Sequence, residues 1–386
     1  NFKEIYGPYK QSDRIDIYKH HYLKLIKEGH AYVCTVKGEE LIPIADIKEG
    51  LDYLKNKNCV IKLKIPDKGI IKIFDELRGN VQFDLSLIDD PIIIKSDGFP
   101  TYHFANVIDD YLMNISHVMR AEEWLPSFPK HVNIYNSLNW QMPIFVHLPM
   151  ILASDKTKLS KRHGATSVNE YRNRGLLSEA LFNYMCLLGW SPEKDTEVFT
   201  KEYAIERFNL EDVLPSSAIF DEAKLMWMNG IYIREMDKDA FYKMCIQEVS
   251  KHLDRSLFDT ETESLKLLVP SIQERIENKN EIFEQVVFVL DEPFKLNVDD
   301  WESVISDKTK HYLIEVKESI KNMDIFDTGV LESTMRNLLE ELDLKPKDGF
   351  QAVRVAVTGS KVSPPLFDSM VALGKAGCLA RLGERI

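Results

Sequence analysis

The sequence predicts an α/β protein that continues into an all-α C-terminal part. Strand-like and helix-like patterns alternate from the start to about residue 150. Short, largely apolar runs at 91–95, 116–120 and 144–148 are typical of strands buried on both faces of a parallel sheet. After residue 239 the apolar residues recur with the helical period instead, and no strand-rich stretch follows.

The first ninety-odd residues are expected to form a small mixed α/β unit. We predict helices over 12–29 and 40–55, and strands over 31–36, 59–65, 69–74 and 81–85, with a turn near Gly79. The run 59–65 alternates apolar with polar residues, as a half-buried strand does.

A strand–helix–strand–helix–strand order follows. We predict strands over the three apolar runs, a helix over 101–111 and a mainly helical stretch over 122–138. This order implies a right-handed parallel sheet with 91–95 in a central position, and such sheets bind ligands at the carboxyl ends of their strands. Later helices are predicted at 241–252, 265–275, 308–320 and 331–342.

The composition limits the class of protein. With 386 residues, 44% hydrophobic and 28% charged, the chain is an ordinary folded protein of about two to four domains. No apolar run approaches the roughly 18–20 residues of a membrane helix, and the first residues do not resemble a signal peptide. The formal net charge of −12 disfavours nonspecific nucleic-acid binding but leaves room for a local basic strip. Five scattered cysteines without a C-x-x-C pair argue against disulfides and structural zinc, and favour a reducing cytoplasm.

The loop 155–164 carries the most informative chemistry. It follows the strand at 144–148 and combines basic side chains and hydroxyls with a glycine. Lysines in such a loop can place positive charge where negative charge develops on a leaving pyrophosphate, and a mobile loop can close over the ligand. Composition alone favours a simpler interpretation, a solvated basic loop, since charge runs are usually exposed.

Several motifs, in this order, resemble those of glutamyl-tRNA synthetases. The run from Lys158 to Arg162 resembles the KMSKS-type signature of class I aminoacyl-tRNA synthetases in its glutamyl form. The segments 96–110 and 120–124 are similar to the active-site segment of that family. Further family-like anchors lie at 7–14, 227–230 and 358–367. The chain therefore resembles a bacterial-type glutamyl-tRNA synthetase over nearly its whole length.

The resemblance implies a partial class I nucleotide-binding (Rossmann-like) parallel sheet with further parts. Residues 1–94 correspond to the end of the first nucleotide-fold half and an α/β insertion for the tRNA acceptor arm, and 95–150 to the second half of the catalytic domain. Residues 151–237 hold the KMSKS-like loop and a stem-contact domain, and 238–386 an α-helical anticodon-binding domain.

The resemblance also implies that Tyr102, Asn106 and Arg120 surround glutamate. Arg120 ends an apolar strand, where a guanidinium can form a bidentate pair with a carboxylate. Asn106 lies one helical turn after Tyr102, on the same face. Without the resemblance, a core-facing phenol and a surface amide would be the simpler interpretation. His147, within a strand, is expected to be a satisfied interior histidine.

ATP binding is implied for Glu123, Trp124, Lys158, Leu159, Ser160, Lys161 and Arg162. Lys161 is the main catalytic candidate, assisted by Lys158 and Arg162. Glu123 would accept a hydrogen bond from substrate, although an acid at a helix N-terminus also simply favours the dipole. Mg²⁺ would accompany ATP, held mainly by phosphate oxygens. No zinc is predicted, because only Cys34 stands where some relatives carry a Cys-x-Cys pair.

The implied reaction is ATP-dependent activation of glutamate to glutamyl-adenylate and its transfer to the 3′ end of tRNA-Glu. The expected protein is a cytoplasmic monomer whose partners are tRNA-Glu, glutamate and ATP, without a membrane. Nothing matches the HIGH signature of the family, so we expect the chain as written to lack part of the ATP site and not to activate glutamate by itself. Two alternatives stay open: a noncatalytic tRNA-binding protein derived from a synthetase, and a nondiscriminating enzyme that also charges tRNA-Gln.

Overall fold

The computed structural model describes residues 8–54, 58–160, 162, 167–193, 195–290 and 293–385. The chain divides into two compact units. Unit 1 comprises residues 1–159 with 188–191 and 208–220, and unit 2 comprises 160–187, 192–207 and 221–386. The finer division into four parts, at residues 94, 150 and 237, stays a prediction.

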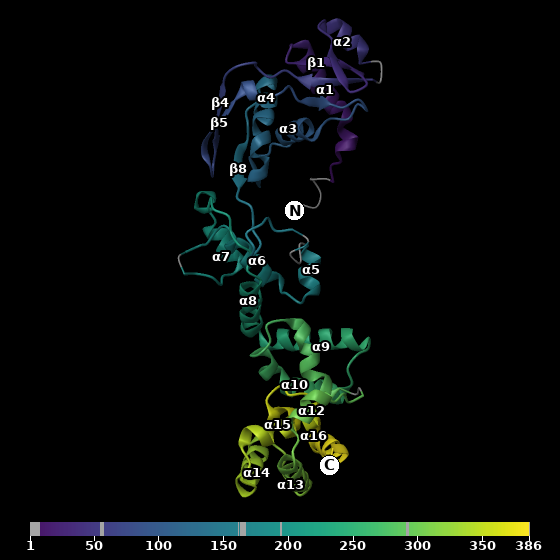
Figure 1. Cartoon of the computed structure of the whole chain (residues 1–386), viewed down its shortest axis with the longest axis vertical. Helices are drawn as coiled ribbons and strands as arrows, with labels where there is room; N and C mark the ends of the chain where they lie inside the picture. The colour runs from purple at the N-terminus through teal and green to yellow at the C-terminus, as the bar shows by residue number, and fades with distance from the viewer. Residues whose placement is uncertain are drawn as a thin grey trace. The chain divides into compact units, whose positions relative to one another are not determined.

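A four-stranded antiparallel sheet opens unit 1. Its strand order is β2 (Glu40–Pro43), β1 (Ala31–Lys37), β3 (Cys59–Leu63) and β6 (Ile92–Ile94). The 3-10 helix η1 (Gln11–Arg14) leads into α1 (Ile15–Lys27), and α1 and α2 (Ile47–Tyr53) pack on β1. A separate hairpin of β4 (Ile70–Asp75) and β5 (Gly79–Asp84) precedes η2 (Leu85–Leu87), as Figure 1 shows. The predicted mixture of helices and strands in the first ninety-odd residues is confirmed.

The strand predicted at 91–95 does not lie in the parallel sheet, and that prediction was wrong. β6 pairs antiparallel with β3, with Ile94 opposite Ile61. The chain then bends back on β6, because the Thr101 hydroxyl donates to the Ile92 carbonyl over 3.0 Å. A short isoleucine run suits an antiparallel neighbour as well as a parallel one, so its apolar composition could not decide between them.

The helix predicted over 40–55 begins later than expected. Lys37 faces Glu40 across a two-residue turn in which Gly38 has a φ of 61°. Such turns need positive φ, which glycine adopts without steric cost, so the chain continues from β1 into β2. Helix α2 starts only after Asp46, whose carboxylate accepts a hydrogen bond from the Glu49 backbone N–H over 2.8 Å.

The parallel pairing predicted for 116–120 and 144–148 is confirmed in β7 (His117–Ala121) and β8 (Ile144–Leu148). Helix α3 (Tyr102–Leu112) precedes β7, and η3 (Glu122–Ser127) with α4 (Phe128–Leu138) connects the two strands. The register places Arg120 directly opposite His147, one residue before β7 ends. Arg120 therefore lies at the carboxyl end of the parallel pair.

One buried carboxylate ties the N-terminal helices of unit 1 together. Asp109 in α3 accepts hydrogen bonds from Gln11 Nε2 (3.1 Å), Arg14 Nε (2.8 Å) and the Tyr18 hydroxyl (2.8 Å). A buried charge is costly unless it is paired, so this triple contact fixes η1 and α1 against α3. A continuous hydrophobic core joins these helices and α4 to the sheets.

All the regular elements in the described residues of unit 2 are helices. Its longer elements are α5 (Val168–Asn173), α6 (Ser178–Leu187), α7 (Lys201–Arg207), α8 (Glu222–Glu235), α9 (Lys238–Leu253), α10 (Asp259–Gln273), α11 (Ile282–Val286), α12 (Val298–Val304), α13 (Asp307–Lys321), α14 (Thr328–Glu341), α15 (Pro346–Thr358) and α16 (Leu366–Arg385). Two short 3-10 helices, η6 (Lys279–Glu281) and η7 (Val287–Val289), flank α11, whereas η5 (Leu210–Asp212) belongs to unit 1. The predicted all-α C-terminal part is therefore confirmed for the described residues from 238 onward.

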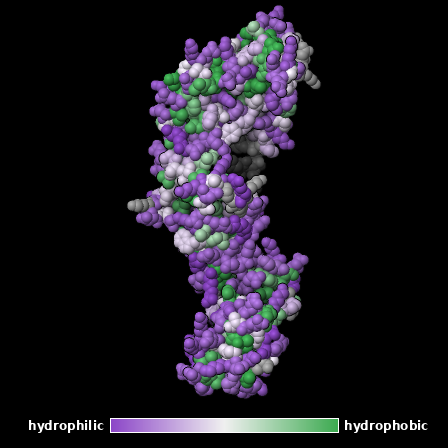
Figure 2. Space-filling model, viewed as in Figure 1, coloured by the Kyte–Doolittle hydropathy of each residue, from purple (hydrophilic) through white to green (hydrophobic). Residues whose placement is uncertain are grey.

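The helices of unit 2 enclose two separate hydrophobic cores. One surrounds Phe241 and Leu265, between α9 and α10, and the other surrounds Tyr312 and Met370, between α13 and α16. Outside them, most of the visible surface is hydrophilic, with isolated apolar patches (Figure 2). Of the helices in the described part of the chain, none is both long and apolar enough to cross a membrane.

A close helix approach fixes one glycine in the C-terminal core. A Cβ added to Gly349 in α15 would clash with the Leu339 side chain and lie 2.9 Å from Tyr312 Cε1. Tyr312 is fully buried, and its hydroxyl donates to the Met335 carbonyl over 3.1 Å, so its ring has little freedom to withdraw. Only glycine fits at this crossing without a shift of its neighbours.

We therefore expect Gly349→Ala to lower the free energy of unfolding by about 1–3 kcal/mol, the usual cost of overpacking a core. Gly329→Ala in α14 is the matched control, because the nearest atom to its added Cβ would be Asp327 Oδ1 at 3.5 Å. The control should be neutral or stabilise by up to about 1 kcal/mol. Urea denaturation measures both. A Gly349→Ala protein as stable as the control would contradict the close approach.

Candidate active site

An aromatic group lies at the start of α3. Tyr102 is half exposed, and its ring centroid lies 5.2 Å from that of Trp124 in η3. The His103 ring lies 6.3 Å from the same indole. Thr101 holds this end of α3 against β6 through the hydroxyl bond described above. The predicted glutamate-binding tyrosine and the predicted ATP-binding tryptophan are thus in contact.

Arg120 presents a half-buried guanidinium without a carboxylate partner in the described part of the chain. Its Nε donates to His147 Nε2 over 3.0 Å, and its Nη1 donates to His131 Nδ1 over 3.3 Å. Its Nη2 is buried and has no hydrogen-bond partner. The guanidinium carbon lies 5.5 Å from the centre of the Phe145 ring and 5.8 Å from that of Phe128. Burial lowers the pKa of Arg120, which shows the cost of its isolation.

The acceptor role of His147 follows from Asp75, the last residue of β4. Both side chains are fully buried, and Asp75 Oδ2 accepts from His147 Nδ1 over 2.6 Å. With the proton on Nδ1, Nε2 offers its lone pair to Arg120. Burial alone would raise the pKa of Asp75, but hydrogen bonds from the His147 ring and from the backbone of Arg78 and His147 lower it overall. Asp75 is therefore the anionic end of this chain of bonds.

On its other side, Arg120 bonds a pair of histidines, His131 and His103. Because Arg120 donates to His131 Nδ1, His131 carries its proton on Nε2 and donates to His103 Nδ1 over 2.8 Å. Burial lowers the pKa of His131 to about 3, with the positive charge of Arg120 adding to the effect. Burial also lowers the pKa of His103. Both histidines are therefore neutral near pH 7.

A second group of predicted residues meets at the KMSKS-like loop. Lys158 Nζ lies 2.5 Å from Glu123 Oε2, and both side chains are about half exposed. The stem of the loop is a narrow turn, in which the Ala153 N–H donates to the Thr157 carbonyl over 2.8 Å. Two backbone hydrogen bonds hold the base of the loop: the Leu152 N–H donates to the Ala218 carbonyl, and the Phe220 N–H donates to the Leu152 carbonyl. An exposed ion pair contributes little to stability, so Lys158 can change partners at small cost.

The remaining predicted residues belong to α3 and to the KMSKS-like loop. Asn106 is partly exposed on α3, one turn after Tyr102, and no hydrogen bond involves its side chain within the described residues. Leu159 and Ser160 are partly buried, and Arg162 is exposed. Lys161, the main catalytic candidate, lies outside the described residues. The structure thus gathers Tyr102, Trp124 and Arg120 in one network and Glu123 with Lys158 in another.

Sequence patterns did not indicate Asp75, Arg78 or His131 as site residues. Arg78 binds the His147 carbonyl through Nε (3.2 Å) and Glu122 Oε2 through Nη2 (2.6 Å). Asp75 ends β4 and Arg78 lies in the turn that leads to Gly79, where charged residues usually have only a local capping role. The sequence around Asp75 and Arg78 therefore predicted only an ordinary hairpin turn.

No group of three or more histidine, cysteine, aspartate or glutamate side chains is placed to hold a metal within the described ranges. Cys34, the cysteine considered for zinc, is buried in β1, and burial raises the pKa of its thiol. The absence of zinc stays a prediction.

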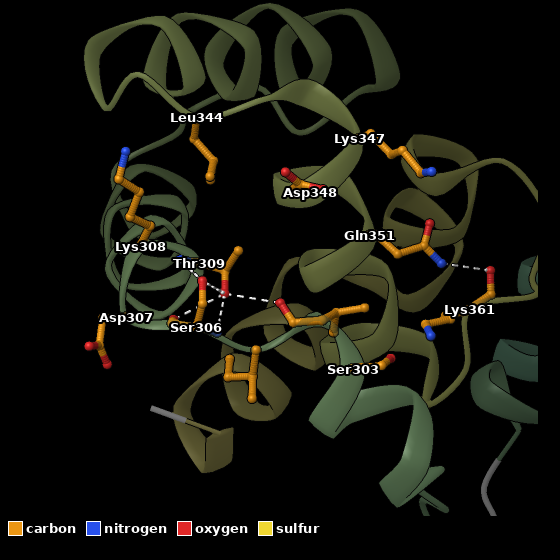
Figure 3. Close-up of a pocket in the computed structure, with 12 residues that line it drawn as sticks. Ser303, Ser306, Asp307, Lys308, Thr309, Leu344, Lys347, Asp348, Gln351 and Lys361 are labelled. Carbon is orange, nitrogen blue, oxygen red and sulfur yellow. Dashed lines mark hydrogen bonds between the residues drawn. The ribbon is translucent and has the colours of Figure 1, made fainter.

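The helical C-terminal part contains a groove of about 820 Å³ (Figure 3). Lys308, Lys347 and Lys361 border it together with Asp307 and Asp348. By sequence, Lys361 and Arg354 are candidates for phosphate contacts, although surface lysines and arginines usually only add solubility. Arg354 instead donates through Nη1 to the Ser363 hydroxyl and the Pro364 carbonyl, each over 2.6 Å, so it has a structural role.

Two family descriptions match the chain. The description "tRNA synthetases class I (E and Q), catalytic domain" matches residues 1–55 and 45–227. The description "Anticodon binding domain" matches residues 240–386.

Curated relatives match nearly the whole chain. It is 40% identical to the glutamate–tRNA ligase of Dehalococcoides mccartyi, over 99% of this chain and 82% of that protein. It is 36% identical to glutamate–tRNA ligase 2 of Caldicellulosiruptor saccharolyticus, over 98% of this chain and 82% of that protein. Among solved structures, a glutamate tRNA ligase from Elizabethkingia meningosepticum in complex with its amino acid superposes with a TM-score of 0.85 and 29% identity, covering 98% of this chain and 84% of that one.

Two neighbouring carboxyls on α3 differ in their surroundings. Burial, with the charge of Asp109 adding, raises the pKa of Asp110 to about 6, whereas Asp109 has three donors. We expect Asp110→Asn to stabilise the protein at pH 8, because it removes a poorly solvated carboxylate. The gain should shrink from about pH 6 and vanish near the unfolded pKa of about 3.9.

The matched control is Asp109→Asn, which should destabilise the protein at pH 8 because three donors lose an anionic acceptor. Urea denaturation between pH 4 and pH 8 measures both variants. A stability difference for Asp110→Asn that does not change over this range would contradict the raised pKa.

Proposed function

This chain belongs to the glutamate–tRNA ligases, within the E and Q group of class I tRNA synthetases, and we propose that Arg120 binds a carboxylate of its glutamate substrate. The observation that carries this proposal is the buried, unpartnered Nη2 of Arg120. A guanidinium in an apolar setting gains most from an anionic ligand that accepts two parallel hydrogen bonds. Glutamate is such a ligand, and its carboxylate would supply the acceptor that Nη2 lacks.

Tyr102 and Asn106 complete the proposed amino-acid site. Both lie on the first turns of α3, and the side chain of Asn106 has no competing hydrogen bond in the described part of the chain. The Tyr102 hydroxyl and the Asn106 amide can both bond one ligand, since residues four apart share a helix face. Asp110 adds a nearby carboxyl that can attract the α-amino group of the substrate.

ATP is the second substrate in the proposed mechanism. A glutamate carboxylate oxygen attacks the α-phosphate of ATP, and pyrophosphate leaves. A terminal ribose hydroxyl of tRNA then loses its proton and attacks the carbonyl carbon of the adenylate, and AMP leaves. Lys158, Lys161 and Arg162 would neutralise the charge that develops on pyrophosphate, and the backbone of Leu159 and Ser160 would shape the loop around it. Glu123 and Trp124 would contact the adenosine. Mg²⁺ would be carried mainly by the phosphates, and no residue here is assigned to it.

The proposal extends to the partners and setting of the protein. The anticodon-binding match over residues 240–386 supports tRNA as the partner of the helical part. We propose that the protein is a cytoplasmic monomer specific for tRNA-Glu, without zinc. Charging of tRNA-Gln by a nondiscriminating enzyme is the alternative that a direct assay must separate.

Pyrophosphate exchange by the product of the complete gene tests the reaction. We expect exchange with glutamate and not with glutamine, and only when tRNA-Glu is present. Arg120→Lys should raise the KM for glutamate by about one hundredfold or more, because it removes bidentate binding. Lys161→Ala should lower kcat by about one hundredfold or more, as expected when a charge-stabilising donor is lost. Binding of tRNA without activation of either amino acid would instead favour the noncatalytic alternative.

The Glu123–Lys158 pair makes a separate prediction about ATP. Lys158→Ala should raise the KM for ATP roughly tenfold, the usual loss for one charge-assisted hydrogen bond. Its KM for glutamate should change little. Lys224→Ala is the matched control, since Lys224 forms an ion pair of the same 2.5 Å length with Glu197 in unit 2. An equal KM for ATP in the two variants would contradict a role of Lys158 in ATP binding.

A further inference from the structure

The guanidinium of Arg120 is held from a hairpin distant in sequence. Three bonds in series lead away from it: Arg120 Nε to His147 Nε2 (3.0 Å), His147 Nδ1 to Asp75 Oδ2 (2.6 Å), and the Arg78 backbone N–H to Asp75 Oδ1 (2.9 Å). Asp75 and Arg78 belong to the tip of the β4–β5 hairpin, which comes well before Arg120 in the sequence. The orientation of the guanidinium therefore depends on the hairpin.

The hairpin itself is locked onto β8 and η3. The Glu76 N–H donates to the Phe145 carbonyl over 2.9 Å, and Arg78 bonds both the His147 carbonyl and Glu122, as described above. The His147 backbone N–H also donates to Asp75 Oδ2 over 3.1 Å. Each contact joins the hairpin to a residue beside Arg120 or on the strand paired with it. The tip of the hairpin is thus fixed against β8, which carries His147, and against η3.

The direction of each bond follows from charge. Arg120 has only donors, so His147 Nε2 must accept and the ring proton must be on Nδ1. An ionised Asp75 stabilises that tautomer, because it can only accept. On the opposite side His131 Nδ1 also accepts from Arg120, over 3.3 Å. The two neutral rings thus accept the Nε N–H and one Nη1 N–H of Arg120. The N–H groups of Nη2 have no partner among the described residues and can bind a ligand.

We propose that Asp75 is a positioning residue for glutamate: through His147, it fixes Arg120 so that the Nη2 edge of the guanidinium points to the substrate carboxylate. This inference rests on the proposed function of Arg120. It adds that a residue of the β4–β5 hairpin, which does not touch the substrate, sets the affinity of the enzyme for its amino acid. Loss of the Asp75 charge removes the preference for the Nδ1–H tautomer, and a proton on Nε2 would face the Arg120 N–H.

A purely structural role for Asp75 predicts a different result. Asp75 also accepts from the Leu77 N–H over 3.2 Å, so its replacement can weaken the hairpin itself. A weakened hairpin would lower stability and total activity without acting on one substrate alone. A positioning role instead raises the KM for glutamate selectively, because only Arg120 binding depends on the His147 tautomer.

The test compares Asp75→Asn, His147→Phe and the double variant in the product of the complete gene, by pyrophosphate exchange with tRNA-Glu. We expect each single variant to raise the KM for glutamate roughly tenfold to one hundredfold, with the KM for ATP within about twofold of the unsubstituted enzyme. The double variant should cost no more than the larger single change, because both act through one chain of bonds. In His147→Phe alone, the buried Asp75 carboxylate loses its partner, which can prevent folding. The double variant has no such carboxylate, so it can be measured even if that single variant does not fold.

Asp84→Asn is the matched control on the same hairpin. Its carboxylate accepts from the Ser86 backbone and hydroxyl and is exposed, so its replacement should leave both KM values unchanged. Thermal unfolding of every variant separates stability from binding.

The outcomes distinguish this inference from the proposed function. An unsubstituted enzyme that activates no amino acid would refute the proposed function. An active enzyme with an unchanged KM for glutamate in the double variant, or with the KM values for glutamate and ATP raised equally, would overturn the positioning role of Asp75 alone. Additive effects of the two single changes would show that Asp75 and His147 act separately, which also contradicts the proposal.

Discussion

A half-buried positive charge that no carboxylate contacts among the described residues governs the arrangement of the segments around β7 and β8. Removing a guanidinium from water costs several kilocalories per mole unless other groups solvate it. Around Arg120, two neutral imidazoles and the faces of two phenylalanine rings provide that solvation. The carboxylate of Asp75 is linked to Arg120 indirectly, through the His147 ring. This arrangement keeps the charge available, because a direct carboxylate partner would compete with an anionic ligand for the same donors.

The fold supplies these groups from separate segments. The β7–β8 register brings His147 beside Arg120, α4 supplies His131, and the β4–β5 hairpin supplies Asp75. Each segment is held in place by its own packing, so the site does not depend on one flexible loop. The KMSKS-like loop differs. Its stem is fixed by backbone bonds, and among the described residues the exposed Lys158 side chain pairs with Glu123 through an ion pair that solvent weakens.

Periodicity predicted most of the elements, because strands 144–148 and 59–65 and the C-terminal helices each have a clear apolar pattern. It failed where partner choice decides the structure. The isoleucine run of β6 does not indicate whether its neighbouring strand is parallel or antiparallel. The turn at Gly38 makes a strand of residues whose spacing predicted the start of a helix. The same limit applies to the site. The motifs pointed to Arg120 and Lys158, but the bonds of Asp75 and His131 are tertiary, and no local pattern contains them.

The attachment of the β4–β5 hairpin to the surroundings of Arg120 has a consequence for how such enzymes can be recombined. The hairpin lies in the part of the chain proposed to hold the tRNA acceptor arm, yet its Asp75 completes the surroundings of Arg120. A chimaera that exchanged this part between two relatives would therefore also exchange a component of the proposed glutamate site. Crossover points that keep Asp75, Arg78 and His147 from one parent preserve the bonds among them. Those that divide the three residues join unmatched halves of one hydrogen-bonded unit.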